Sequence, residues 1–272
     1  MAISKLHYKI FKHGSKTYFN SSRFFPKNKR EDVFVLYGFV RKADDFVDAS
    51  PQDVQGFYVF KNAYLKAKEG KQSGDFIVDS FMRLCEKYDF DLQWVEAFLH
   101  SMELDLTKNE YNSLSEILEY IYGSAEVIGL FMASIMELPK ESYYHAQMQG
   151  RAMQYINFIR DIKEDLSFGR RYLPLENTPL KSLEFDYVLG HEDEFRAFHR
   201  MQIEFYENWQ SEAEKGYSFI PRKYLIPVKT AAAMYLWSAN QIKKNPMIVY
   251  ERKVKPAKWR ILLEFIKHFI GL

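Results

Sequence analysis

The spacing of hydrophobic and polar residues predicts helices along almost the whole chain. Apolar residues recur three and four positions apart, as on the buried face of an α-helix, at about 26–48, 52–69, 76–88, 91–107, 112–137, 192–216 and 228–243, and from Gly150 until Gly169. Residues 175–190 contain the breakers of a loop, and alternating strand patterns are nearly absent. The pattern predicts an all-α protein, with one domain over 1–272 and its helices arranged around a central cavity.

A polar stripe runs along the otherwise apolar helix that starts at Gly150. Gln154, Asn157, Asp161 and Asp165 are spaced three, four and four residues apart, so they share one helical face. Like charges one turn apart repel each other, and they do so more strongly when they are buried. The stripe therefore predicts a cationic group lying against it.

A second acidic stripe lies far upstream, in the segment 26–48. Tyr37, Arg41, Asp44 and Asp48 follow one another at spacings of four, three and four, again on one helical face. Two acidic pairs on separate, mainly apolar helices predict facing helices that share metal ions. Carboxylate pairs suit Mg²⁺, which prefers oxygen ligands and leaves places for water and substrate phosphates.

The composition supports a large apolar core and excludes several classes of function. Hydrophobic residues make up 47% and aromatic residues 17% of the 272 positions, which is more aromatic surface than packing requires. The net charge of +2, without basic runs interleaved by aromatics, argues against nucleic-acid binding. A single cysteine, Cys85, excludes an internal disulfide and a multi-cysteine zinc site, and we expect it to lie in the core.

The ends of the chain bear on its location. The first residues lack the apolar centre of a signal peptide, and no run of about 18 apolar residues predicts a transmembrane helix. With one cysteine suited to a reducing compartment, these features predict a cytoplasmic protein. The amphipathic segment 256–272 either rests on a membrane, which would make the protein peripheral to it, or docks on the bundle, and docking is favoured at least as much.

Three weaker signals accompany the acidic stripes. Ser15 and Thr17 belong to a polar turn that suits a phosphate, although an ordinary turn explains it better. Small residues around Gly123 favour close helix packing, with the wall of a substrate tunnel as the alternative. Glu103 and Asp105 are interpreted as part of a polar helix face.

In this order along the chain, the motifs resemble the squalene/phytoene synthase family, the head-to-head prenyl transferases. The first acidic motif reads DDFVD at 44–48, and the second reads NFIRDIKED at 157–165, with GRRYLP following at 169–174. All the acidic positions are intact, which argues against an inactive member. The resemblance extends from about residue 13 to 253 and is supported by Ser-Lys-Thr at 15–17, Tyr-Gly at 122–123, Tyr235 and Glu-Arg at 251–252.

The resemblance implies an isoprenoid-synthase-type bundle around an apolar cavity and a Mg²⁺-dependent enzyme, with Mn²⁺ as the alternative metal. It implies metal binding by Asp44, Asp48, Asn157, Asp161 and Asp165. It implies that the catalytic residues are Arg41, Asp44, Asp48, Tyr122, Asp161 and Asp165. It implies contacts to two prenyl diphosphates by Ser15, Thr17, Tyr37, Arg41, Gln154, Asn157, Tyr235 and Arg252.

The activity implied by the resemblance is head-to-head condensation of two identical prenyl diphosphates through a cyclopropyl intermediate. Two C20 geranylgeranyl units would give phytoene, a step of carotenoid biosynthesis. The alternative is a C15 substrate that gives dehydrosqualene, squalene or presqualene diphosphate, and NADPH is required only for squalene. An inactive helical scaffold is disfavoured by the four intact aspartates, and a terpene cyclase by the motif order and the GRRYLP tail. No feature indicates an oligomeric state.

Overall fold

Helices dominate the protein in its computed structural model, which describes residues 5–14 and 25–270. No strand occurs in these ranges, where one isolated β-bridge joins Glu110 and Arg171. The first half contains α1 (Lys5–Gly14), α3 (Lys27–Val47), α4 (Val54–Lys68), α5 (Phe76–Tyr88), α6 (Leu92–Thr107), α7 (Leu114–Ile121), η2 (Tyr122–Glu126) and α8 (Val127–Ile135). The second half contains η3 (Lys140–Ser142), α9 (Tyr143–Arg160), α10 (Ile162–Ser167), α11 (Phe185–Leu189), α12 (Glu192–Lys215), η4 (Gly216–Phe219), α13 (Arg222–Lys244), α14 (Ile248–Glu251) and α15 (Lys258–Ile270). The predicted all-α fold is confirmed.

Local capping explains why many helices begin where the pattern predicts. The side chains of Asp53, Asp75, Asp91 and Ser113 each accept a hydrogen bond from a backbone N–H in the first turn of the helix that follows. Such caps satisfy donors that have no partner inside the helix. The predicted segments at 52–69, 76–88 and 91–107 therefore agree closely with α4, α5 and α6.

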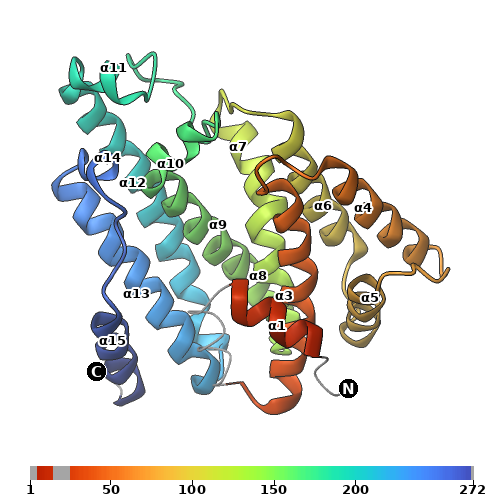
Figure 1. Cartoon of the computed structure of the whole chain (residues 1–272). Helices are drawn as coiled ribbons and strands as arrows, with labels where there is room; N and C mark the ends of the chain where they lie inside the picture. The colour runs from red at the N-terminus through yellow and green to blue at the C-terminus, as the bar shows by residue number, and fades with distance from the viewer. Residues whose placement is uncertain (1–4, 15–24, 271–272) are drawn as a thin grey trace.

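The helices enclose two hydrophobic clusters that meet along α8 and α9. The first cluster is built mainly by α1, α3, α4, α5, α6 and α8, and the second by α7 and by α9 to α14. In Figure 1 the orange-to-yellow helices lie on one side and the cyan-to-blue helices on the other, with α9 between them. Cys85 is buried in the first cluster, as predicted, and burial raises the pKa of its thiol to about 12.

Small residues let the central helices approach closely. A Cβ atom at Gly123 would lie 2.1 Å from the carbonyl oxygen of Ala97, and one at Gly129 would lie 2.2 Å from that of Ala146. Close packing is thus the role of these glycines. Among the described residues one helical stretch, Leu114–Ile135, is long and apolar enough to cross a membrane, but 56% of its apolar window is buried, as expected for a helix inside the bundle.

Three elements differ from the predicted pattern. The helix expected at 112–137 contains the π-helical turn η2, and the loop expected at 175–190 contains α11. The helix expected to start after Pro227 already begins at Arg222. Pro227 removes one backbone hydrogen bond, and the turn before it is held by Tyr224, which is buried and stacked on Phe25 with ring centroids 4.8 Å apart.

Candidate active site

The first acidic motif lies at the C-terminal end of α3. Arg41 pairs with the exposed Asp45 over 2.6 Å, and Asp48 ends the helix with its N–H bonded to the Asp44 carbonyl over 2.9 Å. Asp44 is half-buried and Asp48 is exposed. Burial and the nearby Asp48 raise the pKa of Asp44 to about 8, although Arg41 acts in the opposite direction. At neutral pH the Asp44 carboxyl therefore favours its protonated form, and a cation bound beside it would favour loss of that proton.

The second acidic motif lies where α9 ends and α10 begins. The pattern predicts one continuous helix, but Asp161 interrupts it with φ −101° and ψ 17°. Backbone bonds of Asp161 to Asn157 and of Asp165 to Asp161, at 2.8 and 2.9 Å, keep the two helices aligned. Arg160 Nε donates to Asp161 Oδ1 over 2.9 Å. Burial, Asp161 and Glu164 raise the pKa of Asp165 to about 8.

Arg170, in the GRRYLP segment, connects the two acidic motifs. Its Nη2 donates to the carbonyl of Val47 over 2.9 Å, and its Nη1 lies 3.5 Å from Asp48 Oδ1. Its charge also acts on Asp165, where it offsets part of the rise in pKa. The ends of α3 and α10 thus face one site. A cation does lie against each acidic stripe: Arg170 lies near both, and Arg160 contacts the stripe that contains Asp161.

Asp105 of α6 forms the centre of a hydrogen-bond network beside Arg170. It is 5% exposed and accepts hydrogen bonds from the hydroxyls of Tyr120 over 2.8 Å and Tyr172 over 2.9 Å. Arg170 donates to the Tyr172 hydroxyl over 3.3 Å and to the Asp105 carbonyl over 3.4 Å. Burial raises the pKa of Asp105 to about 6, against the effect of Arg170. The negative charge of Asp48 contributes to this rise, so the network belongs to the same site.

The interpretation of Asp105 as part of a polar helix face is wrong. Residues two apart on a helix point to different sides, and Glu103 pairs with Lys61 over 2.7 Å while Asp105 faces the interior. The partners of Asp105 come from other parts of the chain. The only local signal was a carboxylate in a largely apolar helix.

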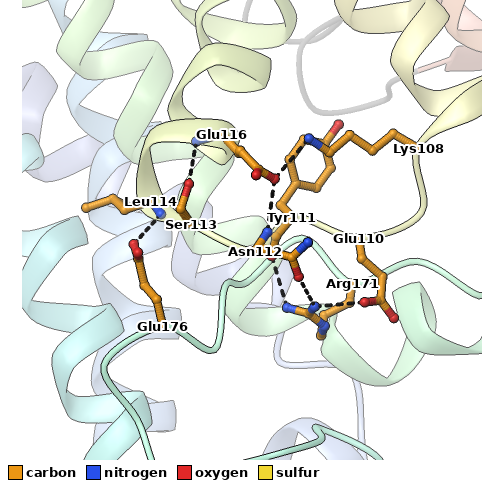
Figure 2. Close-up of polar contacts among 9 residues, drawn as sticks. All are labelled: Lys108, Glu110, Tyr111, Asn112, Ser113, Leu114, Glu116, Arg171 and Glu176. Atoms are coloured by element: carbon orange, nitrogen blue, oxygen red, sulfur yellow. Dashed lines mark hydrogen bonds and ion pairs between the residues drawn. The ribbon is translucent and has the colours of Figure 1, made fainter.

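Arg171 holds the segment that carries Arg170. Its guanidinium donates, over 2.9–3.0 Å, to oxygens of Glu110, Tyr111, Asn112 and Leu173. Figure 2 shows how the bonds to Glu110, Tyr111 and Asn112 and the neighbouring Lys108–Glu116 pair connect the loop between α6 and α7. The two adjacent arginines therefore differ, because Arg170 faces the carboxylates and Arg171 holds the loop.

The end of α1 covers Tyr37 and Arg41. A Cβ atom at Gly14 would lie 2.4 Å from the Tyr37 hydroxyl and 3.2 Å from Arg41 Cδ. Both side chains are half-buried, on the face that leads to the first acidic motif. Ser15 and Thr17, predicted to contact diphosphate, lie outside the described residues.

Tyr120, rather than Tyr122, is the tyrosine that this helix contributes to the site. Tyr122 is 36% exposed. Burial, Glu126 and Asp91 raise its pKa, and neither of these two carboxylates belongs to an acidic motif. The buried Tyr120 donates to Asp105. Side chains two positions apart point about 200° apart around a helix. The Tyr-Gly pair at 122–123 therefore indicated a tyrosine on the side of the helix opposite Tyr120.

Three further predicted residues lie on α9 and α13. Gln154 and Asn157 are half-buried on α9, on the turns that precede Asp161. Tyr235 of α13 is half-buried, and its hydroxyl affects the pKa of Arg160. These positions place all three beside the second acidic motif.

Two lysines approach the second motif from the segment that contains Arg252. Arg252 ends α14, and its side chain is exposed. Lys253 pairs with Glu164. Burial, Lys253 and Arg160 lower the pKa of Lys255, so Lys255 lies close to the same cationic and acidic groups. The resemblance implies a role for Arg252. Lys253 and Lys255, which alternate with Val254 in the sequence, lie on the side that faces the second acidic motif.

The oxygen donors of the two acidic motifs suit a hard divalent cation. Within 5–14 and 25–270, no three His, Cys, Asp or Glu side chains are grouped closely enough to hold a metal ion by themselves. Each motif instead offers a carboxylate pair, Asp44 with Asp48 in the first and Asp161 with Asp165 in the second. Asn157 adds an amide oxygen to the second. Such half-sites fit Mg²⁺, which keeps waters and accepts substrate phosphates in its shell.

Two of the hollows in the described part of the chain adjoin α10 and α15. One of about 370 Å³ lies beside the second motif and is lined partly by Leu166, Gly169 and Arg170. Another of about 550 Å³ lies between α13 and α15. Neither is the apolar cavity expected at the centre of the bundle, which stays a prediction.

Sequence comparison finds relatives along nearly the whole chain. The squalene/phytoene synthase family model matches residues 11–260. The 15-cis-phytoene synthase of Synechococcus elongatus is 25% identical over 266 residues, covering 91% of this chain and 86% of the relative. The phytoene synthase of Arthrospira platensis is 25% identical over 268 residues, covering 92% and 86%.

Solved structures share the fold. A crystal structure of a dehydrosqualene synthase in complex with ligand has a TM-score of 0.83 at 22% identity, covering 97% of this chain and 94% of that one. The squalene synthase HpnC from Alicyclobacillus acidocaldarius has a TM-score of 0.78 at 16% identity, covering 90% and 94%. This likeness confirms an all-α bundle of the isoprenoid-synthase type.

Proposed function

Since the chain belongs to the squalene/phytoene synthase family and is an enzyme of the prenyltransferase type, we propose that it joins two prenyl diphosphates head to head in a Mg²⁺-dependent reaction. The phytoene synthases among its relatives favour geranylgeranyl diphosphate as substrate and phytoene as product. The observation that carries the proposal is the meeting of the two acidic motifs beside Arg170. The family match supports one synthase-like unit over 1–272.

Both acidic motifs would bind the diphosphates. Asp44, Asp48, Asn157, Asp161 and Asp165 would hold Mg²⁺, with Mn²⁺ as the alternative, and the bound metal neutralises charge on the leaving group. Arg41 and Arg170 provide fixed guanidinium groups for phosphate oxygens. Tyr37, Gln154, Tyr235 and the lysines at 253 and 255 border the same space, and Ser15, Thr17 and Arg252 stay proposed contacts.

The chemistry needs charge stabilisation and protection from water. The allylic C–O bond of one substrate breaks, the cation adds to the double bond of the other, and loss of a proton closes a cyclopropane. A second ionisation releases the other diphosphate, rearrangement and ring opening leave a linear cation, and loss of a second proton gives the linear hydrocarbon. Tyr172 stacks on Phe158 with centroids 4.4 Å apart, and such aromatic faces next to the site stabilise nearby cations by roughly 0.5–2 kcal/mol. Asp105 fixes the orientation of Tyr120 and Tyr172.

The second candidate uses two C15 units and yields dehydrosqualene, squalene or presqualene diphosphate. The structural likeness to a dehydrosqualene synthase favours keeping it, and NADPH enters only if squalene is formed. An inactive scaffold is disfavoured because every acidic position is present. We place the enzyme in the cytoplasm, in peripheral contact with a membrane.

The test is to incubate purified protein with geranylgeranyl or farnesyl diphosphate and Mg²⁺, with and without NADPH, and to identify the product by mass. We expect a C40 hydrocarbon and released pyrophosphate. Asp44→Ala and Asp161→Ala should abolish turnover with unchanged helical circular dichroism, whereas Asp193→Ala, an exposed aspartate of α12, should not. A C30 product would replace the C20 assignment, and near-normal activity of either site variant would refute the proposed metal roles.

A further inference from the structure

The C-terminal helix α15 turns its apolar stripe away from the protein. Its exposed large side chains recur at spacings of three and four residues and so form one continuous face: Trp259, Leu262, Leu263, Ile266, Phe269 and Ile270. Leu262 and Phe269 are each 60% exposed. We call these six residues the α15 stripe.

The opposite side of α15, where polar and apolar residues are mixed, faces α13. Arg260 lies over the ring of Trp237 at 5.4 Å, and a lysine of α13 acts on the pKa of His268. Ile261 and Phe265 on this side are only half-buried. A surface helix normally buries its apolar stripe against the core, whereas α15 leaves most of its large apolar side chains exposed. The helix is docked on the bundle, as one of the two sequence interpretations holds, and its apolar stripe is nevertheless free.

The chain around α15 is strongly basic. Glu264 is the one acidic residue of α15, and five cations lie on this helix or on the part of α13 beside it: Arg222, Lys223, Lys229, Arg260 and Lys267. Two of these cations, Arg222 and Lys223, line the hollow of about 550 Å³ together with Ile226 and Phe269. Cations thus border the stripe at the point where the hollow adjoins Phe269.

We propose that the α15 stripe docks on a lipid bilayer that contains anionic lipids. The apolar side chains would enter the boundary between headgroups and acyl chains, and the surrounding cations would meet lipid phosphates. A second copy of the chain fits less well, because two surfaces of the same strong positive charge repel each other.

The position of α15 agrees with this orientation. It lies at the end of the bundle away from α10 and the second acidic motif (Figure 1). Docking would leave the acidic site in water and bring the protein to a phase in which long apolar chains dissolve. The proposal depends on α15 and not on the proposed activity.

The test is flotation of the complete protein with vesicles of phosphatidylcholine, with and without phosphatidylglycerol, at low and high salt. We expect binding to be at least about tenfold stronger with phosphatidylglycerol and to weaken with salt. Leu262→Glu with Phe269→Glu should lower binding by about tenfold or more. Val59→Glu on α4 is the matched control, since Val59 is 63% exposed outside the stripe, and it should bind like the unaltered protein.

Circular dichroism checks that each variant is folded, and light scattering checks whether it is a monomer or a dimer. All variants should keep the helical signal, and a blue shift of tryptophan emission on vesicle binding should be reduced in Trp259→Phe. The proposal is overturned if no vesicle binds the protein, if the double variant binds as before, or if the same substitutions only separate a dimer into monomers. Because no substrate is used, failure here is distinguishable from failure of the proposed reaction.

Discussion

Arg170 and Arg171 are adjacent in the chain, yet their guanidinium groups contact different parts of the molecule. Arg170 lies among the carbonyl of Val47, Asp48 and the Asp105 network, whereas Arg171 holds the loop after α6. Both side chains are largely buried, so burial does not distinguish them. Their contacts distinguish the two arginines, and these contacts predict different consequences of substitution.

We expect Arg170→Gln to lower turnover about 10²–10³-fold, the usual effect of removing one oriented donor to developing negative charge. Arg171→Gln should instead lower the free energy of unfolding by about 2 kcal/mol or more, because the carbonyls of Tyr111 and Leu173 lose their donor. Steady-state kinetics and urea denaturation measure the two effects. If Arg171→Gln abolished turnover in fully folded protein while Arg170→Gln did not, the division of roles would be refuted.

His199 of α12 predicts a pH dependence of stability. It is fully buried beside Phe195, with ring centroids 4.3 Å apart, and burial lowers its pKa to about 3. Between this value and the unfolded pKa of about 6.5 the unfolded state binds the extra proton, so stability falls as pH falls, by about 1.4 kcal/mol per unit.

His199→Gln should remove this contribution, which amounts to about 2 kcal/mol at pH 5. Urea denaturation of both proteins between pH 5 and 8 measures it as the difference between their two slopes. Parallel stability curves would contradict the prediction.

At the scale of elements, the close contact of η2 with α6 determines what Gly123 tolerates. In Gly123→Ala the new Cβ atom would lie 2.1 Å from the backbone oxygen of Ala97, so the helices must separate. We expect the free energy of unfolding to fall by about 1–3 kcal/mol. The matched control is Gly190→Ala, where the nearest atom is 3.7 Å away and φ is −89°. Equal melting temperatures of the two variants would show that the approach of the helices is looser than described.

At the scale of the whole molecule, the proposed site joins two halves that have separate hydrophobic clusters. The first acidic motif is carried by α3 of one cluster and the second by α9 and α10 of the other. A diphosphate held between them should therefore stabilise the complete fold, because it binds the native state and not the unfolded chain.

We expect Mg²⁺ and inorganic pyrophosphate together to raise the melting temperature by several degrees, about 2.7 kcal/mol at one hundred times the dissociation constant. Either component alone should have a smaller effect, since the like-charged carboxylates repel free pyrophosphate. Asp44→Ala should remove the joint shift. An equal shift with pyrophosphate and EDTA would argue against a metal-dependent site.

Much of this molecule could be predicted from local sequence. Helix periodicity and caps such as Asp75 and Asp91 act within a few residues, so α5 and α6 follow from them. The acidic stripes are local for the same reason, since the spacing of Asp44 and Asp48 on a helix is enough to place them on one face.

Only the tertiary structure decided which groups meet. Asp105 receives hydrogen bonds from Tyr120 and Tyr172, and α15 places Arg260 over Trp237 of α13 while its apolar stripe stays exposed. The pattern of α15 showed that it has an apolar stripe but could not show which way the stripe faces. Burial, the pKa of a carboxyl group and the direction of a helix face depend on atoms brought near by packing, and the two tyrosine partners of Asp105 lie 15 and 67 residues away in the chain.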